Sequence, residues 1–183
     1  LQQEGFSCTI YDEHEQPGGM LRYGVSEQDL PKDVLNKEIA LIEKLGVKFE
    51  NKVRIGTGKN MLSPEALRKD FDAVFVATGK LNTEATEPLG LHTGANGIAI
   101  NKNTYETNLP GVFAGGDSIR SQNKQSLAVR AVADGKEAAV SISQFLSNQT
   151  VTGPVKPFNT RIGKIRNEEV EISPLLGSDV ALL

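Results

Sequence analysis

Two nearly unbroken apolar runs, each closed by glycine, constrain the fold of this chain more than any other feature. Residues 71–79 read FDAVFVATG, and residues 111–117 read GVFAGGD. Runs of this kind are typical of parallel strands that are covered on both faces. Because helical patterns lie between and after the strands, the sequence predicts an α/β fold with a parallel sheet flanked by helices.

The rest of the chain alternates short strands with helices. We expect further strands at residues 6–12, 47–50 and 97–100, a helix end at 1–4, and helices over 33–45, 64–69 and 126–146. Asp33 is the expected N-cap of the first full helix, and Ser63 precedes a proline at the first position of the second. Residues 1–148 are expected to form one domain, and residues 149–183 an extended C-terminal tail.

The composition of the chain excludes several classes of ligand and redox centre. The net charge of -3 leaves no electrostatic footprint for nucleic acid, and no apolar run approaches the roughly 20 residues of a membrane span. Cys8 is the only cysteine, which excludes an internal disulfide, a cysteine-pair redox centre and a cysteine-ligated iron–sulfur cluster carried by this chain alone. His14 and His92 show no metal-ligand spacing, so we expect no metal site. Redox chemistry would therefore need a bound organic cofactor, in a cytoplasmic protein.

Three constellations favour a nucleotide site. Asp12 ends a strand and is followed by Gly18 and Gly19; an acid at that point of a doubly wound fold can accept hydrogen bonds from a ribose. The small residues 77–79 end a second strand, where such sheets bind ligands. The glycines and the acid of residues 115–117 end a third, just before a helix N-terminus. Each also has a plainer interpretation as a solvated turn or a strand exit.

One apparent dinucleotide motif is a false positive. Gly56-Thr57-Gly58 starts such a fingerprint, but Met61 stands where its third glycine belongs, and no helix begins directly there. No intact G-x-G-x-x-G occurs anywhere in the chain.

Four segments in this order resemble the glutamate synthase small-subunit group, which includes the flavin part of dihydropyrimidine dehydrogenase. They are QPGGMLRYGV (16–25), LNKEIALIEKLGVKF (35–49), FDAVFVATGK (71–80) and TNLPGVFAGGDS with SLAVRAVADGKEAA (107–139). The resemblance covers residues 1–148 and implies a Rossmann-like, FAD-binding fold. In that group NAD(P)H passes a hydride to FAD, and electrons continue to iron–sulfur clusters or to an amidotransferase subunit or domain. The resemblance implies no oligomeric state and no catalytic side chain.

The resemblance also implies a set of cofactor-binding residues. Asp12 would hold the adenosine ribose, and Val53 would lie near the adenine. The remaining expected contacts lie along the pyrophosphate, the ribityl chain and the flavin ring: Gly18, Gly19, Leu21, Arg22, Ala77, Thr78, Gly79, Gly116, Asp117, Leu127 and Ala128.

The chain departs from the group's pattern in three places, of which the least is Ser26, where the group usually has a proline. The glycine fingerprint and first strand that precede Leu1 in the group are missing, and the NAD(P)H domain that the group inserts near residues 79–81 is missing too. A lost central strand would expose the edges of its neighbours. We therefore expect the chain by itself to bind FAD weakly or not at all, and to be inactive with NAD(P)H.

Two alternatives to a flavin-binding portion follow from the residues. A truncated, cofactor-free Rossmann-like module could serve as a scaffold or partner domain; the absent fingerprint favours it, and the retained Gly18-Gly19 and Gly115–Asp117 elements oppose it. A relative of the disulfide reductases is excluded here because the chain has no cysteine pair.

Overall fold

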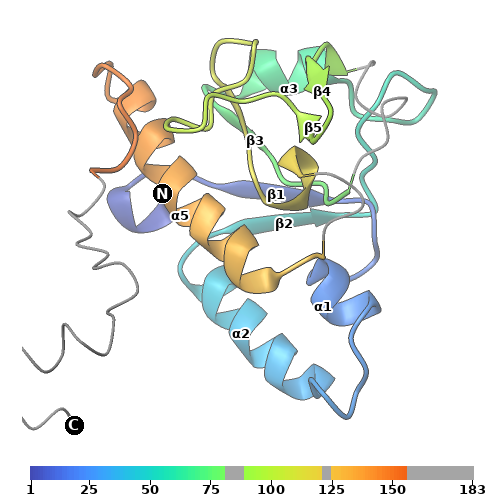
Figure 1. The fold of residues 1–183 in the computed structure, drawn as a ribbon. Helices are drawn as coiled ribbons and strands as arrows, with labels where there is room; N and C mark the ends of the chain where they lie inside the picture. The colour runs from blue at the N-terminus through green and yellow to red at the C-terminus, as the bar shows by residue number, and fades with distance from the viewer. Residues whose placement is uncertain (81–88, 121–124, 156–183) are drawn as a thin grey trace, which may run out of the picture.

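The computed structural model describes residues 1–80, 89–120 and 125–155, and it has the expected α/β architecture (Figure 1). Two pairs of parallel strands form its centre: β1 (Thr9–Asp12) pairs with β2 (Lys48–Asn51), and β3 (Val74–Val76) pairs with β6 (Val112–Ala114). The helices are α1 (Gly19–Tyr23), α2 (Lys32–Lys44), α3 (Pro64–Asp70) and α5 (Ala128–Leu146), with short 3-10 turns η1 (Gln2–Glu4) and η3 (Gly116–Ile119).

The strands at the centre are shorter than the sequence predicts. The expected strand 6–12 forms only from Thr9, and the apolar run 71–77 is extended sheet only over Val74–Val76. Among the described residues, β1 and β3 each join a ladder along one edge alone, so the residues that flank them have no second strand to pair with. The strand β6 differs, because its other edge bonds to residues 105–107. The last strand, Val112–Ala114, has the expected bounds and is buried throughout, with Phe113 packed edge-on against Phe145 at 5.9 Å between ring centroids.

The expected N-cap of α2 is wrong. The helix begins after Pro31, and Asp33 lies inside its first turn, where it pairs with Lys37 at 3.5 Å. The backbone N–H of Lys32 instead donates to the Glu27 side chain at 2.9 Å. A carboxylate from the preceding loop thus takes the capping role. By contrast, the Ser63 cap of α3 is confirmed, because its hydroxyl accepts from the Ala66 N–H at 3.1 Å.

The helix α1 was not expected, since the sequence predicted only a loop around Gly18 and Gly19. Its single turn closes where the Gly24 N–H donates to the Met20 carbonyl at 2.9 Å. A five-residue helix carries too little periodicity to be visible in a sequence pattern.

The second half of the molecule holds the core. Leu91, Ile98, Val112 and Ala114 are buried together, and a small antiparallel pair, β4 (Thr93–Gly94) and β5 (Gly97–Ile98), covers η3. After α5, Thr152 and Gly153 both donate backbone N–H groups to the Gln144 side chain. This start of the expected tail therefore folds back on the helix; residues 156–183 lie outside the described part of the chain.

The two strand pairs are separate sheets. Within residues 1–80, 89–120 and 125–155, β1 has no ladder partner besides β2, and β3 none besides β6. Contact between the halves includes Tyr11 against Phe71, at 6.0 Å between ring centroids and 85° between ring planes. Ile10 and Phe75, in the middle of β1 and β3, remain 42% and 36% exposed. The sheet is thus incomplete between β1 and β3 in the described part of the chain.

None of the described helices is both long enough and apolar enough to cross a lipid bilayer.

Candidate functional site

The carboxyl end of β1 is a tightly bonded acidic turn. Asp12 accepts, through Oδ1, from the backbone N–H of His14 at 2.9 Å and contacts the His14 ring at 2.8 Å. The Asp12 carbonyl accepts from the Val53 N–H at 3.0 Å, so Asp12 and Val53, two expected binding residues, are neighbours. Only Oδ1 takes part in these bonds, which leaves Oδ2 to accept from a ligand hydroxyl.

Salt bridges hold this turn against the segment after β2. Lys52 pairs with Glu15 at 2.6 Å, and Arg54 lies 3.5 Å from Glu13. The hydrogen bond from Lys52 and its positive charge lower the pKa of Glu15. The turn that carries Asp12 is therefore fixed at both ends.

Gly18 and Gly19 lead into α1 with positive φ angles of 128° and 50°. A Cβ at Gly18 would lie 3.1 Å from the Leu35 side chain, whereas nothing lies within 4 Å of one at Gly19. Arg22 donates from all three of its side-chain nitrogens, to the Pro17 carbonyl and to the side chains of Gln16 and Asn36. Arg22 thus ties α1 to α2, while Leu21 is 39% exposed.

The carboxyl end of β3 is open. Ala77 and Thr78 are exposed, and Gly79 adopts a φ of 77° with no atom within 4 Å of a built Cβ. An uncrowded backbone in the left-handed region allows a flat ligand to approach closely.

The carboxyl end of β6 is bonded to the end of β3 by several hydrogen bonds. The Gly115 N–H donates to the Val76 carbonyl at 3.2 Å. The Ser118 hydroxyl shares its one hydrogen between the carbonyls of Gly115 at 2.7 Å and Val76 at 3.2 Å. These bonds bring residues 77–79 and residues 116–117, two of the expected groups, to one edge of the β3–β6 pair.

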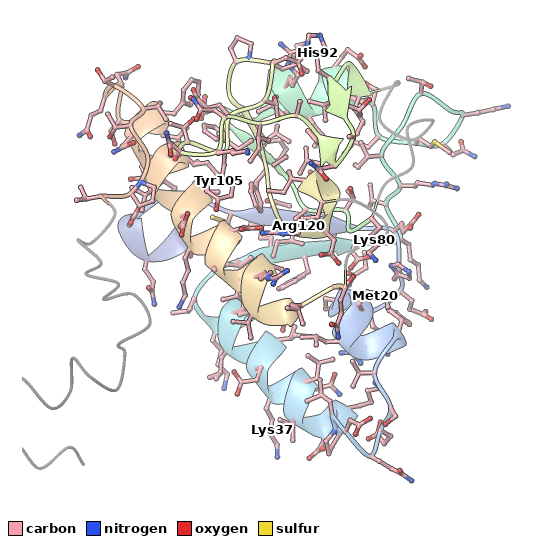
Figure 2. The ribbon with its side chains drawn as sticks, viewed as in Figure 1. Met20, Lys37, Lys80, His92, Tyr105 and Arg120 are labelled. Atoms are coloured by element: carbon pink, nitrogen blue, oxygen red, sulfur yellow. The ribbon has the colours of Figure 1, made fainter. Side chains whose placement is uncertain are left out.

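A buried carboxylate, Asp134 of α5, bonds to the turn that follows β6. The sequence patterns did not single it out. It accepts from the Gly116 N–H at 2.8 Å, from both terminal nitrogens of Arg120, and from the Tyr105 hydroxyl at 3.2 Å. The Tyr105 hydroxyl also lies 2.9 Å from Glu137 Oε2, so its single hydrogen is shared between the two carboxylates. Figure 2 shows Tyr105 and Arg120 beside α5. An acid within the apolar helix pattern AVADGKEAA was the available signal.

The charges of this cluster perturb one another. Burial is the largest influence on Asp134 and by itself raises its pKa, but hydrogen bonds from Arg120 and Gly116 outweigh it, so the pKa is lowered overall. The Asp134 hydrogen bond raises the pKa of Arg120. Burial, then Glu137 and Asp134, raise the pKa of Tyr105. The cluster is therefore an ion pair with a neutral phenol at physiological pH.

The amino end of α5 lacks a side-chain cap. Leu127 occupies the N-cap position, and its carbonyl accepts from the N–H groups of Arg130 and Ala131. Within residues 1–80, 89–120 and 125–155, no side-chain hydrogen bond caps the first turn, which includes Ala128. Uncapped N–H groups at a helix start suit an electron-rich ligand atom.

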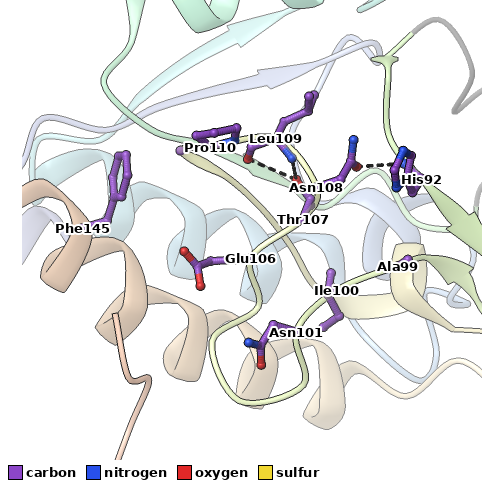
Figure 3. Close-up of a pocket in the computed structure, with 11 residues that line it drawn as sticks. His92, Ala99, Ile100, Asn101, Glu106, Thr107, Asn108, Leu109, Pro110 and Phe145 are labelled. Carbon is purple, nitrogen blue, oxygen red and sulfur yellow. Dashed lines mark hydrogen bonds between the residues drawn. The ribbon is translucent and has the colours of Figure 1, made fainter. Parts of the chain in front are cut away.

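A cavity of about 500 Å³ lies elsewhere, at the amino end of β6 (Figure 3). Pro110 and Gly111, which precede the strand, line it together with Phe145 and His92. The His92 N–H donates to the Asn108 side chain at 2.8 Å. No residue of the expected site lines this cavity, since the expected site lies at the carboxyl ends of the strands.

The expected site residues thus form two groups. One surrounds Asp12 and Val53 on the β1–β2 pair, and the other surrounds residues 77–79 and 116–117 on the β3–β6 pair. Whether both groups contact one ligand remains a prediction. Within the described residues, no group of three histidine, cysteine, aspartate or glutamate side chains could hold a metal ion.

Comparison with known proteins points to one family. A sequence profile described as pyridine nucleotide-disulphide oxidoreductase matches residues 27–135. The NADP(+)-dependent formate dehydrogenase subunit beta of Moorella thermoacetica is 34% identical over 113 residues, 61% of this chain and 14% of that protein. The NAD-dependent dihydropyrimidine dehydrogenase subunit PreT of Escherichia coli K12 is 39% identical over 93 residues, 51% of this chain and 22% of that protein.

The glutamate synthase (NADPH) small chain of Bacillus subtilis is 27% identical over 110 residues, 57% of this chain and 22% of that protein. The chain therefore spans about a fifth or less of these curated relatives. The profile match corrects the exclusion of disulfide reductase relatives. A lone Cys8 rules out a cysteine-pair centre in this chain, but it does not rule out common descent with enzymes that have one.

Proposed function

The chain belongs to the pyridine nucleotide-disulphide oxidoreductase family, and from this membership we propose that it is the flavin-binding portion of an NAD(P)H-dependent oxidoreductase. The observation that carries the proposal is the bonded edge where β3, the Gly115–Asp117 segment and α5 meet. In parallel α/β sheets, ligands bind beyond the carboxyl ends of the strands.

The residues at this edge, and those that follow β1, fit FAD. Gly79 and Gly19 leave open space where a Cβ would stand, so the backbone can approach a ring or a phosphate. In the part of the chain that the structure describes, Asp12 Oδ2 has no hydrogen bond, so it would accept from a ribose hydroxyl, and Asp117 would accept from the ribityl chain. Bound FAD supplies the hydride and electron chemistry, while the chain's residues hold and orient it.

The relatives suggest where the electrons go. Their names describe subunits of a formate dehydrogenase, a dihydropyrimidine dehydrogenase and a glutamate synthase. We propose that the intact protein passes electrons from NAD(P)H through FAD to iron–sulfur clusters or to a partner subunit, as in a glutamate synthase small chain, in the cytoplasm. The domain would comprise residues 1–148, with the NAD(P)H domain absent near residues 79–81.

A cofactor-free scaffold is the second candidate. Two features favour it: no G-x-G-x-x-G occurs in the chain, and β1 and β3 each have an unpaired edge in the described residues. That motif normally supplies the N–H groups that bind the pyrophosphate. The open backbone at Gly19 and Gly79 is present all the same. Of the two outcomes expected from the sequence, we therefore propose the first: FAD binding by this chain alone is weak but saturable at high FAD concentration, and NAD(P)H oxidation is absent.

A titration of the purified chain with FAD, followed by flavin fluorescence and visible absorption, separates the two candidates. Flavin binding predicts saturable quenching, and Asp117→Asn should weaken it about tenfold by loss of a charged acceptor. Asp33→Asn, an exposed change on α2, is the matched control and should bind FAD as the wild type does. Absence of saturable binding supports the scaffold, and NAD(P)H-driven dye reduction by the chain alone would contradict the expected inactivity.

A further inference from the structure

The peptide groups on both sides of one glycine are clamped by a single buried ion pair. Asp134 accepts from the Gly116 N–H at 2.8 Å, and Arg120 donates to the Gly116 carbonyl at 2.5 Å while it also binds Asp134. The Asp134 side chain is 7% exposed and that of Arg120 is 21% exposed. With its N–H and its carbonyl both fixed, Gly116 is held at its φ of 70°.

This clamp acts on the segment that directly precedes Asp117. The Gly115–Asp117 turn is also bonded to the end of β3, through the Gly115 N–H and the Ser118 hydroxyl. Asp134 projects from α5, whose amino end is another part of the proposed site. The Asp134 carboxylate therefore links α5 to the Gly115–Asp117 turn. Separate hydrogen bonds link that turn to the end of β3.

We infer that Asp134, paired with Arg120, is a positioning residue that fixes the Gly115–Asp117 turn for cofactor binding, without touching the cofactor itself. The inference rests on the proposed function, because the turn has this role only if FAD binds there. It adds two residues that neither the sequence motifs nor the resemblance had assigned to the site.

The presence of an ion pair, Asp134 with Arg120, supports a role in positioning the turn rather than a role in core packing alone. A buried ion pair costs desolvation free energy that apolar side chains of similar volume avoid. The hydrogen bonds of this ion pair are directional, however, because the Asp134 carboxylate accepts from Gly116 and Arg120 together. A change at either partner should therefore alter the turn. Tyr105 completes the shell of Asp134 without contacting the turn's backbone in any described hydrogen bond.

The first test measures the Gly116 amide in the purified chain by NMR hydrogen exchange. In Asp134→Asn we expect the Gly116 amide to exchange at least about tenfold faster, relative to the Lys48 amide of the other sheet. The Lys48 N–H donates to the Cys8 carbonyl far from the cluster and corrects for any general loss of stability. Tyr105→Phe removes a donor to Asp134 but no bond to the turn, so it should leave this ratio unchanged.

If Asp134→Asn does not fold, Arg120→Lys is measured in its place. Lysine keeps the positive charge but cannot bond to Asp134 through two nitrogens, so the Gly116 amide should again exchange faster than in the wild type. An unchanged Gly116 ratio in the folded variant, or an equal effect of Tyr105→Phe, would overturn the inference.

The second test measures FAD affinity by fluorescence in the same variants. Asp134→Asn should bind FAD about tenfold more weakly than the wild type, with an altered visible band of the bound flavin, whereas Tyr105→Phe should match the wild type in both. Wild-type affinity and spectrum in Asp134→Asn would refute positioning while leaving the proposed function intact. A wild-type chain that binds no FAD would refute the proposed function, and the role in cofactor binding would fall with it.

Discussion

At the scale of single residues, Asp134 shows how a buried charge becomes tolerable in this fold. Its carboxylate is surrounded by a guanidinium, a backbone N–H and a phenol, so the cost of burial is offset by bonds to the charged form. The sequence places these partners 14 to 29 positions from Asp134, and no local pattern predicts which of them meet. The strand end at Asp12, in contrast, was predictable because the β-branched and aromatic residues of the strand stop there, at an acidic cluster.

The lowered pKa of Asp134 predicts a pH dependence of stability. Because the pKa is depressed in the folded state, the stabilisation is fully present above the unfolded value near 4 and is lost as pH falls through the folded pKa. Asp134→Asn should therefore lower the free energy of unfolding by about 2–4 kcal/mol at pH 7, and by less at pH 3. Urea unfolding of wild type and variant at both pH values measures this, and a difference that does not shrink at low pH would contradict it.

At the scale of elements, the sequence predicted what depends on local chemistry. The Ser63 cap, the strand Val112–Ala114 and a helix ending at Leu146 were all predicted and are confirmed. The cap of α2 was wrong because a remote side chain, Glu27, supplied it. The central strands were predicted too long because strand length is set by neighbouring strands, which a single segment does not encode.

Two glycines in different elements should respond oppositely to alanine. Gly97 of β5 has a φ of 105°, and a Cβ there would overlap the backbone carbonyl oxygen of Ser118, so Gly97→Ala should cost about 2–4 kcal/mol. Gly135 lies within α5 with open space around it, so Gly135→Ala should add about 0.5–1 kcal/mol through helix propensity. Thermal unfolding of both variants checks the pair, and destabilisation by Gly135→Ala would show that α5 is packed there.

At the scale of the whole molecule, the fold class was predictable and the site only in part. Apolar runs ended by glycine predicted parallel strands, and β3 and β6 pair in parallel. Bonds from Gly115 and Ser118 to the Val76 carbonyl place residues 77–79 and residues 116–117 at the same edge of this pair. The distribution of the strands over two separate sheets was not predictable from the local patterns, because it depends on which strand edges meet. For the same reason, the group around Asp12 and the group around Asp117 remain linked only by prediction.

The central claim is that these two groups bind one FAD molecule. Amide NMR spectra of the isotope-labelled chain, recorded during an FAD titration, test it most directly. The account predicts that the amides of Asp12, Gly19, Gly79 and Gly116 shift together with a single dissociation constant, while that of Asn108 beside the opposite cavity stays in place. Shifts confined to one sheet, or gathered around Asn108, would contradict it.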